Sequence, residues 1–148
     1  MAQDKSGSKD NLPRGLFWKT LSCPVTEKEF KVVAVKSNAY SVRGRDPDFN
    51  VQYDGINPAH YGVFVSPGGF AAEEGVFRRT PKLLFKDLDE VKARMKQLKN
   101  LPDFNVERPL ALVCYSYELA LGYIPYLRLP LSEKGGLALK AAWMYQDL

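Results

Sequence analysis

The sequence of 148 residues predicts an α+β fold in which a small antiparallel β module packs against a C-terminal bundle of about three helices. Two patterns support this prediction. Short runs rich in valine and aromatic residues, separated by turn residues, fill the first half of the chain. Longer segments with apolar residues three and four positions apart fill the second half. We therefore divide the chain into a polar tail at residues 1–13, a β-rich module at 14–80 and a helical region at 81–148.

Three strands are expected in the β module. Residues 29–36 read EFKVVAVK, residues 39–43 alternate apolar and polar side chains, and residues 61–65 are mostly β-branched or aromatic. Residues that favour tight turns separate these runs, at Asp46-Pro47-Asp48, at Asn57-Pro58 and at Pro67-Gly68-Gly69.

The helical region is expected to contain three helices. Asp87, with Glu90 three residues later, predicts a capping box for the first helix, which ends before Pro102. The second helix should cover residues 107–124, and Ser132 can cap the third. Each helix has one apolar stripe: Leu84, Leu88, Val91, Met95 and Leu98 in the first, Leu110, Val113, Tyr117, Leu121 and Ile124 in the second, and Leu137, Ala141, Met144 and Leu148 in the third.

The composition is mildly basic, with a formal net charge of +4 and a pI near 9.0. Acidic residues interrupt the basic ones, whereas a nucleic-acid binder usually gathers its cations on one face. We therefore do not expect nucleic acid as the main partner. The chain has no run of about 18 apolar residues, so we expect no membrane insertion. Its N-terminus lacks the apolar segment of a secretory signal, which indicates a cytoplasmic protein.

Two groups of residues are candidates for catalysis. Asp46 and Asp48 lie near Arg43, where they can form an acid–base or metal site, or bond to their own backbone as turn residues do. Cys23 can act as a nucleophile only if a base lies within hydrogen-bond reach, and His60 is the sole histidine. Turn formation accounts for the aspartates more simply, so we expect that the protein is not an enzyme.

A series of spaced motifs runs along the chain, from Cys23-Pro24-Val25-Thr26 through Gly55-Ile56-Asn57-Pro58 and Val63-x-Val65-Ser66-Pro67 to Ala142-Trp143-Met144-Tyr145. In order and spacing these motifs resemble a bacterial family known as domain of unknown function 2225. The resemblance extends from about Leu16 to the C-terminus. It implies a β module with two Cys-Pro-x-Cys knuckles, like those of a zinc ribbon, followed by TPR-like helices.

The chain departs from the family pattern at the knuckles. That pattern implies cysteines near Cys23, Thr26, Ser66 and Gly69, but only the first of these is a cysteine. A structural zinc site needs four nitrogen or sulfur ligands, so we expect a degenerate zinc ribbon with no metal and no cofactor. Aromatic packing is expected to hold the two turns together instead, through Phe17, Trp18, Phe30, Phe64, Phe70 and Phe77.

The function that these features favour is a non-enzymatic protein-interaction or scaffold module. Its helical region should dock to a partner protein or to a second copy, because a single TPR-like pair buries its apolar faces only by stacking on a neighbour. Two alternatives remain open: a nucleic-acid-binding zinc-ribbon-like domain, and an enzyme that uses the Asp46/Asp48 loop. The side chains expected at the docking surface are Tyr117, Tyr123, Tyr126, Trp143, Tyr145 and Leu148.

Overall fold

The computed structural model describes residues 12–148, so almost all of the polar tail predicted at residues 1–13 lies outside the described residues. The chain forms antiparallel strand pairs and a C-terminal helical region, which confirms the α+β class. The strands are β1 (Leu16–Ser22), β2 (Glu29–Val35), β3 (Tyr40–Arg45), β4 (Val51–Gly55), β5 (Val63–Val65) and β6 (Ala71–Glu73). The helices are η1 (Pro58–Tyr61), α2 (Glu74–Phe77), α3 (Pro81–Leu84), α4 (Leu88–Gln97), α5 (Leu110–Tyr123), η2 (Ile124–Tyr126) and α6 (Leu131–Asp147).

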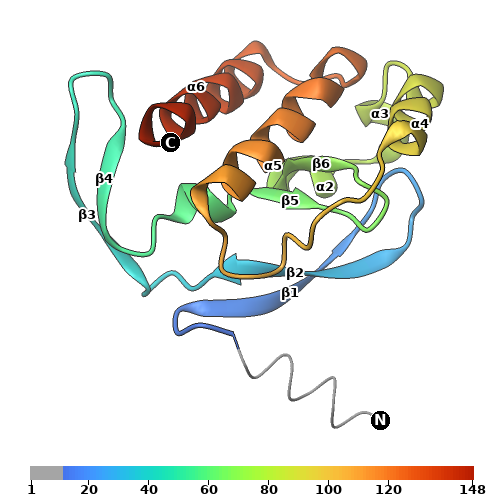
Figure 1. The fold of residues 1–148 in the computed structure, drawn as a ribbon. Coiled ribbons are helices and arrows are strands. Elements are labelled where there is room, and N and C mark those ends of the chain that lie inside the picture. The colour runs from blue at the N-terminus through green and yellow to red at the C-terminus, as the bar shows by residue number, and fades with distance from the viewer. Residues whose placement is uncertain (1–11) are drawn as a thin grey trace, which may run out of the picture.

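The elements lie in layers (Figure 1). Helices α5 and α6 pack along each other above the β5–β6 hairpin, and the β1–β2 hairpin lies below it. The β3–β4 hairpin stands at one end of the molecule, beside the C-terminal end of α6. Within residues 12–148, each strand pairs only with its neighbour in sequence, so the three hairpins form three separate two-stranded sheets.

The central residues of β2, Val32 to Ala34, are buried on both faces of the β1–β2 hairpin. One face contributes Phe30 and Val32 to the main core, whereas the other contributes Val33 to a small second cluster with Leu16 and Tyr61. A strand buried on both faces reads as a continuous apolar run, which is why residues 29–36 stood out in the sequence. The predicted strand is confirmed, with its end at Val35.

The β5–β6 hairpin is short and lies at the centre of the molecule. All three residues of β5 are buried, and β5 and β6 both contact α5. The strand predicted at residues 61–65 begins two residues late, because Tyr61 belongs to the η1 turn. The side chain of Asn57 caps this turn by accepting a hydrogen bond of 2.9 Å from the Ala59 amide.

The β3–β4 hairpin, called the arm below, is far more exposed. Its strands pair from Tyr40 opposite Gly55 to Arg45 opposite Val51, with a bulge at residues 42–44. The rings of Tyr40 and Tyr53 meet edge to face with their centroids 5.5 Å apart. Every residue of β3 after Tyr40 is exposed, so the arm is held chiefly by its own ladder.

The three predicted helices are present, but the second and third begin at other residues than predicted. The Asp87 carboxylate accepts a hydrogen bond of 3.1 Å from the Glu90 amide, as expected of an N-cap. The second helix begins at Leu110 rather than residue 107, because Pro109 is its extended N-cap. The third begins at Leu131, with Pro130 rather than Ser132 at the N-cap. The sequence did not predict β1, β4, β6, α2 and α3.

One hydrophobic core joins the β-rich and helical regions. It contains Phe30 and Phe70 from the first region, and Val113, Tyr117 and Met144 from the second. The division predicted at residues 80 and 81 therefore falls between α2 and α3, over a core that both regions share.

Candidate functional site

The first of the two predicted knuckle turns joins β1 to β2. The Cys23 amide donates to the Lys28 carbonyl at 2.9 Å, and the Glu27 amide donates to the Cys23 carbonyl at 2.7 Å. The Cys23 thiol is buried, whereas Thr26 is exposed and its hydroxyl accepts a hydrogen bond from the Lys28 amide at 3.3 Å. Thr26 therefore faces solvent and serves the turn locally.

The second turn joins β5 to β6 and is closed by Ser66. The Ser66 hydroxyl, which is buried, accepts a hydrogen bond of 3.1 Å from the Phe70 amide. Gly69 has a φ of +99°, and a Cβ added there would meet the Leu98 side chain at 2.4 Å. Glycine at this position therefore allows both the left-handed backbone and the close approach of the segment that follows α4.

Tyr123, at the end of α5, bonds to the second turn. Its hydroxyl donates a hydrogen bond of 2.9 Å to the Gly69 carbonyl. Burial raises the pKa of Tyr123 to about 12, and the Cys23 thiol is close enough to add a smaller effect in the same direction. Tyr123 therefore fastens the second turn to α5 and shares the main core with Cys23 of the first turn.

The residues at these turns do not fit a zinc ion. A thiol, two hydroxyls and a glycine stand at the four positions, and hydroxyl groups are not ligands of structural zinc sites. Among residues 12–148, no group of three or more histidine, cysteine, aspartate or glutamate side chains is gathered so that it could hold a metal ion.

Four of the six aromatic residues expected to pack around the turns are buried in the main core, namely Phe30, Phe64, Phe70 and Phe77. The Phe70 ring lies 5.7 Å from that of Phe77 and 5.2 Å from that of Tyr123. Phe17 and Trp18 do not join this cluster. Both lie near the opposite end of the β1–β2 hairpin, where Phe17 remains 36% exposed and Trp18 packs against the second cluster.

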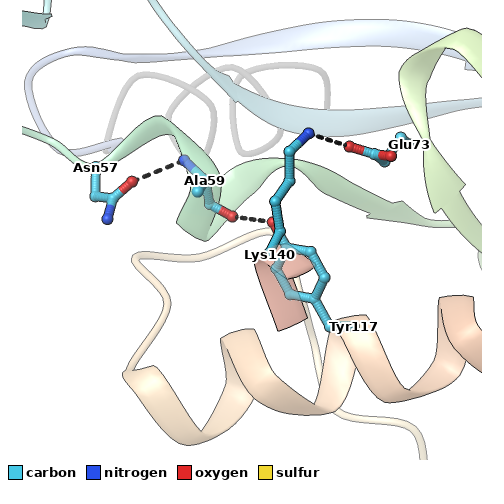
Figure 2. Close-up of polar contacts among 5 residues, drawn as sticks. All are labelled: Asn57, Ala59, Glu73, Tyr117 and Lys140. Carbon is cyan, nitrogen blue, oxygen red and sulfur yellow. Dashed lines mark hydrogen bonds and ion pairs between the residues drawn. The ribbon is translucent and has the colours of Figure 1, made fainter. Parts of the chain in front are cut away.

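A set of polar contacts fastens the helical layer to the β layer (Figure 2). The Tyr117 hydroxyl donates a hydrogen bond of 2.6 Å to the Ala59 carbonyl, in the η1 turn that Asn57 caps. Lys140 of α6 forms an ion pair of 2.7 Å with Glu73 of β6. Burial raises the pKa of Tyr117 above its ordinary value near 10, so this hydroxyl remains a donor into alkaline solution.

Arg108 provides a second fastening, which the sequence did not reveal. Its guanidinium is buried and donates to the carbonyls of Phe104 at 2.9 Å, Val63 at 2.9 Å and His60 at 3.1 Å. No carboxylate of residues 12–148 pairs with this guanidinium, and burial lowers the pKa of Arg108 to about 10. The arginine ties the segment before α5 to the open edge of β5.

Asn105 does the same for the open edge of β2. Its side-chain carbonyl accepts from the Val33 amide at 3.2 Å, and its amide group donates to the Lys31 carbonyl at 3.2 Å. A side-chain amide thus takes the place of a neighbouring strand, which leaves this stretch of the edge paired. A cavity of about 250 Å³ remains beside it, between Phe30, Ser66 and residues 101–105.

The aspartates of the Asp46/Asp48 loop bond within their own turn. The Asp46 carboxylate accepts from Gln52 at 2.6 Å, and the Asp48 carboxylate accepts from the Asn50 amide at 3.2 Å. Arg43 lies 3.7 Å from Asp54, and both side chains are exposed. These contacts indicate that the acidic residues stabilise the exposed tip of the arm.

The structure separates the six residues predicted at the docking surface. Tyr117 and Tyr123 are buried in the core with bonded hydroxyls, so they are corrected to core residues. Tyr126 and Trp143 are half-buried, and the Arg94 guanidinium lies 5.8 Å from the centroid of the Tyr126 ring. Tyr145 and Leu148 are exposed.

The outward side of α6 carries a stripe that the sequence pattern only hinted at through its small residues. Every residue of this stripe is exposed and none is charged. No heavy atom lies within 4 Å of a Cβ added at Gly135, so the helix surface is open at this position. The stripe, called the outward stripe below, consists of Gly135, Ala138, Leu139, Ala142, Tyr145 and Gln146.

Comparison with known proteins yields one match. The model of a family described as an uncharacterized protein conserved in bacteria, DUF2225, matches residues 16–148. No curated protein and no solved structure matches the chain significantly. In the described part of the chain, no helix is both long enough and apolar enough to cross a membrane.

Proposed function

The chain belongs to the bacterial DUF2225 family, and we propose that it acts there as a non-enzymatic protein-interaction module that docks through α6. The observation that carries this proposal is the outward stripe. A helix that faces water normally places charged residues on its exposed side, but this stripe has none over about three turns.

The shape of the stripe favours a second helix as the docked element. Side chains are absent or minimal at Gly135, Ala138 and Ala142, so another backbone can approach closely along this line. Leu139 and Tyr145 stand on either side of it and remain 45% and 42% exposed. Two flanking apolar side chains around a shallow channel are suited to an amphipathic helix that buries its own apolar stripe.

The inward side of α6 is firmly packed, so the helix can present the outward stripe as a fixed surface. Leu137, Ala141 and Met144 of the opposite side are buried against α5, and the Lys140–Glu73 pair anchors the middle of the helix. A partner therefore meets a preformed face and pays little ordering cost when it binds.

The proposal is tested by introducing a charge among the small residues of the outward stripe. Ala142→Arg adds a long cation to an exposed position, so folding should be unaffected while docking is lost. Light scattering coupled to size-exclusion chromatography over a range of concentrations should show self-association of the parent protein and a monomer for the variant. Lys92→Glu, on the exposed side of α4, is the matched control and should behave as the parent does.

The same variants identify the partner if the parent protein is a monomer. A photo-crosslinking residue at position 142 should then capture one distinct polypeptide in the native cell, and the same residue at position 92 should not. A monomer whose crosslinks at positions 142 and 92 are the same would contradict the proposal.

A further inference from the structure

We propose that one end of the molecule, formed by α3 and the beginning of α6, binds an anionic membrane surface. Two leucines protrude at this end, and basic residues lie within three positions of each of them in the sequence. The surface, called the basic end below, consists of Leu83, Leu131, Lys82, Lys86, Arg128 and Lys134. This inference does not depend on the docking proposed for the outward stripe.

The two protruding leucines lie on adjoining segments of the chain. Residues 79–86 and 126–133 are tied together at one end by the Arg79–Glu133 ion pair. At the other end the Arg128 amide donates to the Leu84 carbonyl at 2.7 Å, and the Lys86 amide donates to the Tyr126 carbonyl at 2.8 Å. Leu83 and Leu131 fall between these ties, one on each segment.

The inward residues of the same segments explain why the leucines point to solvent. Leu84 and Leu127 are fully buried, and Phe85 pairs with Leu127 in an antiparallel bridge. The side chains of Leu84, Phe85 and Leu127 therefore point into the core. Leu83 and Leu131 remain 73% and 85% exposed. A single exposed leucine is common in soluble proteins, but two at one end are the beginning of an apolar patch.

The charges on the two segments that carry the leucines are predominantly positive. Lys82, Lys86, Arg128 and Lys134 form no ion pair with a carboxylate of residues 12–148. The nearby carboxylates have other roles, since Glu133 pairs with Arg79 and Asp87 caps α4. Anionic lipid headgroups would complement this unpaired positive charge.

The form of the basic end favours a membrane over a protein groove or a nucleic acid. Side chains exposed to this degree project outward, as an element that enters a headgroup layer must do. A phosphate backbone would use the cations but would gain little from the leucines, because its contacts are ionic. Dependence on the leucines therefore distinguishes a membrane from a nucleic acid.

Flotation with lipid vesicles tests the proposal. The parent protein should float with vesicles of phosphatidylcholine mixed with phosphatidylglycerol, and much less with pure phosphatidylcholine. Each of Leu83→Ser and Leu131→Ser should weaken this binding by about tenfold. Each of Lys82→Gln and Lys86→Gln should weaken it by about fivefold. Because all four positions are exposed, the variants should keep the circular dichroism spectrum and the melting temperature of the parent.

Leu139→Ser is the matched control, since it removes an exposed leucine from the same helix at the outward stripe. It should leave vesicle binding unchanged, so failure of this proposal and failure of the docking proposal can be told apart. The proposal is overturned if the parent does not float with anionic vesicles. It is equally overturned if both leucine variants bind vesicles as the parent does, or if duplex DNA binds the parent and both leucine variants with equal affinity.

Discussion

Two hairpins of this molecule, β5–β6 and the arm, have the same antiparallel pairing but very different support. The β5–β6 hairpin has strands of only three residues, yet it is buried beneath α5. The arm has strands of six and five residues and is largely exposed. The short hairpin is held from outside its own ladder, by side chains of Arg108 and Tyr123 that donate to its carbonyl groups. Burial beneath α5 and side-chain donors from distant segments, and not strand length, thus distinguish the support of the two hairpins.

Removal of the Arg108 guanidinium should have the largest effect on the support of the β5–β6 hairpin. Arg108→Met keeps much of the apolar stem but leaves three carbonyls without a donor, so the free energy of unfolding should fall by about 3 kcal/mol. Urea unfolding followed by circular dichroism measures the change. Arg43→Met on the arm is the control, and its effect should stay within about 0.5 kcal/mol.

Removal of the Tyr123 hydroxyl should have a smaller effect. Tyr123→Phe deletes the bond to Gly69 and should cost about 1.5 kcal/mol at neutral pH. The folded protein holds the Tyr123 proton up to a pKa of about 12, above the ordinary value of 10, so its stability should fall as the pH rises between these values. Urea midpoints at several alkaline pH values should fall less steeply for the variant. Equal slopes would show that this hydroxyl does not titrate differently on unfolding.

Loss of the Asn105 side chain from the open edge of β2 should have a smaller effect on stability. Asn105→Ala leaves the Val33 amide and the Lys31 carbonyl without the partner that replaces a strand, and should cost about 1 kcal/mol. Hydrogen exchange of the Val33 amide should accelerate, because its acceptor has been removed. Asn38→Ala, at an exposed loop position between β2 and the arm, should change neither quantity.

The smallest expected effect concerns the tip of the arm. Phe49 has a φ of +68° and remains 68% exposed, so its side chain strains the backbone and gains little from packing. Phe49→Gly should raise the free energy of unfolding by about 0.5 kcal/mol, since glycine adopts this conformation freely. Phe49→Ala retains the Cβ and should show no such gain. A stabilising alanine would indicate that exposure of the ring, rather than the backbone, is the cause.

The sequence was informative where a local pattern is characteristic of one element, such as a continuous apolar run or a capping residue. Strand β2 and the N-cap of α4 at Asp87 are found where they were predicted. Strand β1 has no clear alternation, because Leu16 and Leu21 face different clusters. Strand β6 contains two alanines, which have low strand propensity, so pairing with β5 decides its conformation.

The burial of the residues expected at the docking surface was predicted less well, for a physical reason. Tyr117 and Tyr123 are amphipathic, and whether they face solvent depends on carbonyl acceptors more than fifty positions earlier in the chain. Arg108 gave no sequence signal at all, since an isolated arginine before a proline is usually a surface residue. The outward stripe was visible as a run of small residues, but its exposure depends on how α6 packs against α5.

The exclusive pairing of each strand with its sequence neighbour has a consequence for the order of folding. All three ladders can close over short loops, so they can form early and independently at little entropic cost. The segment around Asn105 and Arg108 must then arrive between two finished hairpins and connect them. We therefore expect its arrival to be the late, rate-determining event, and substitutions at Arg108 to slow refolding more than substitutions within any one hairpin.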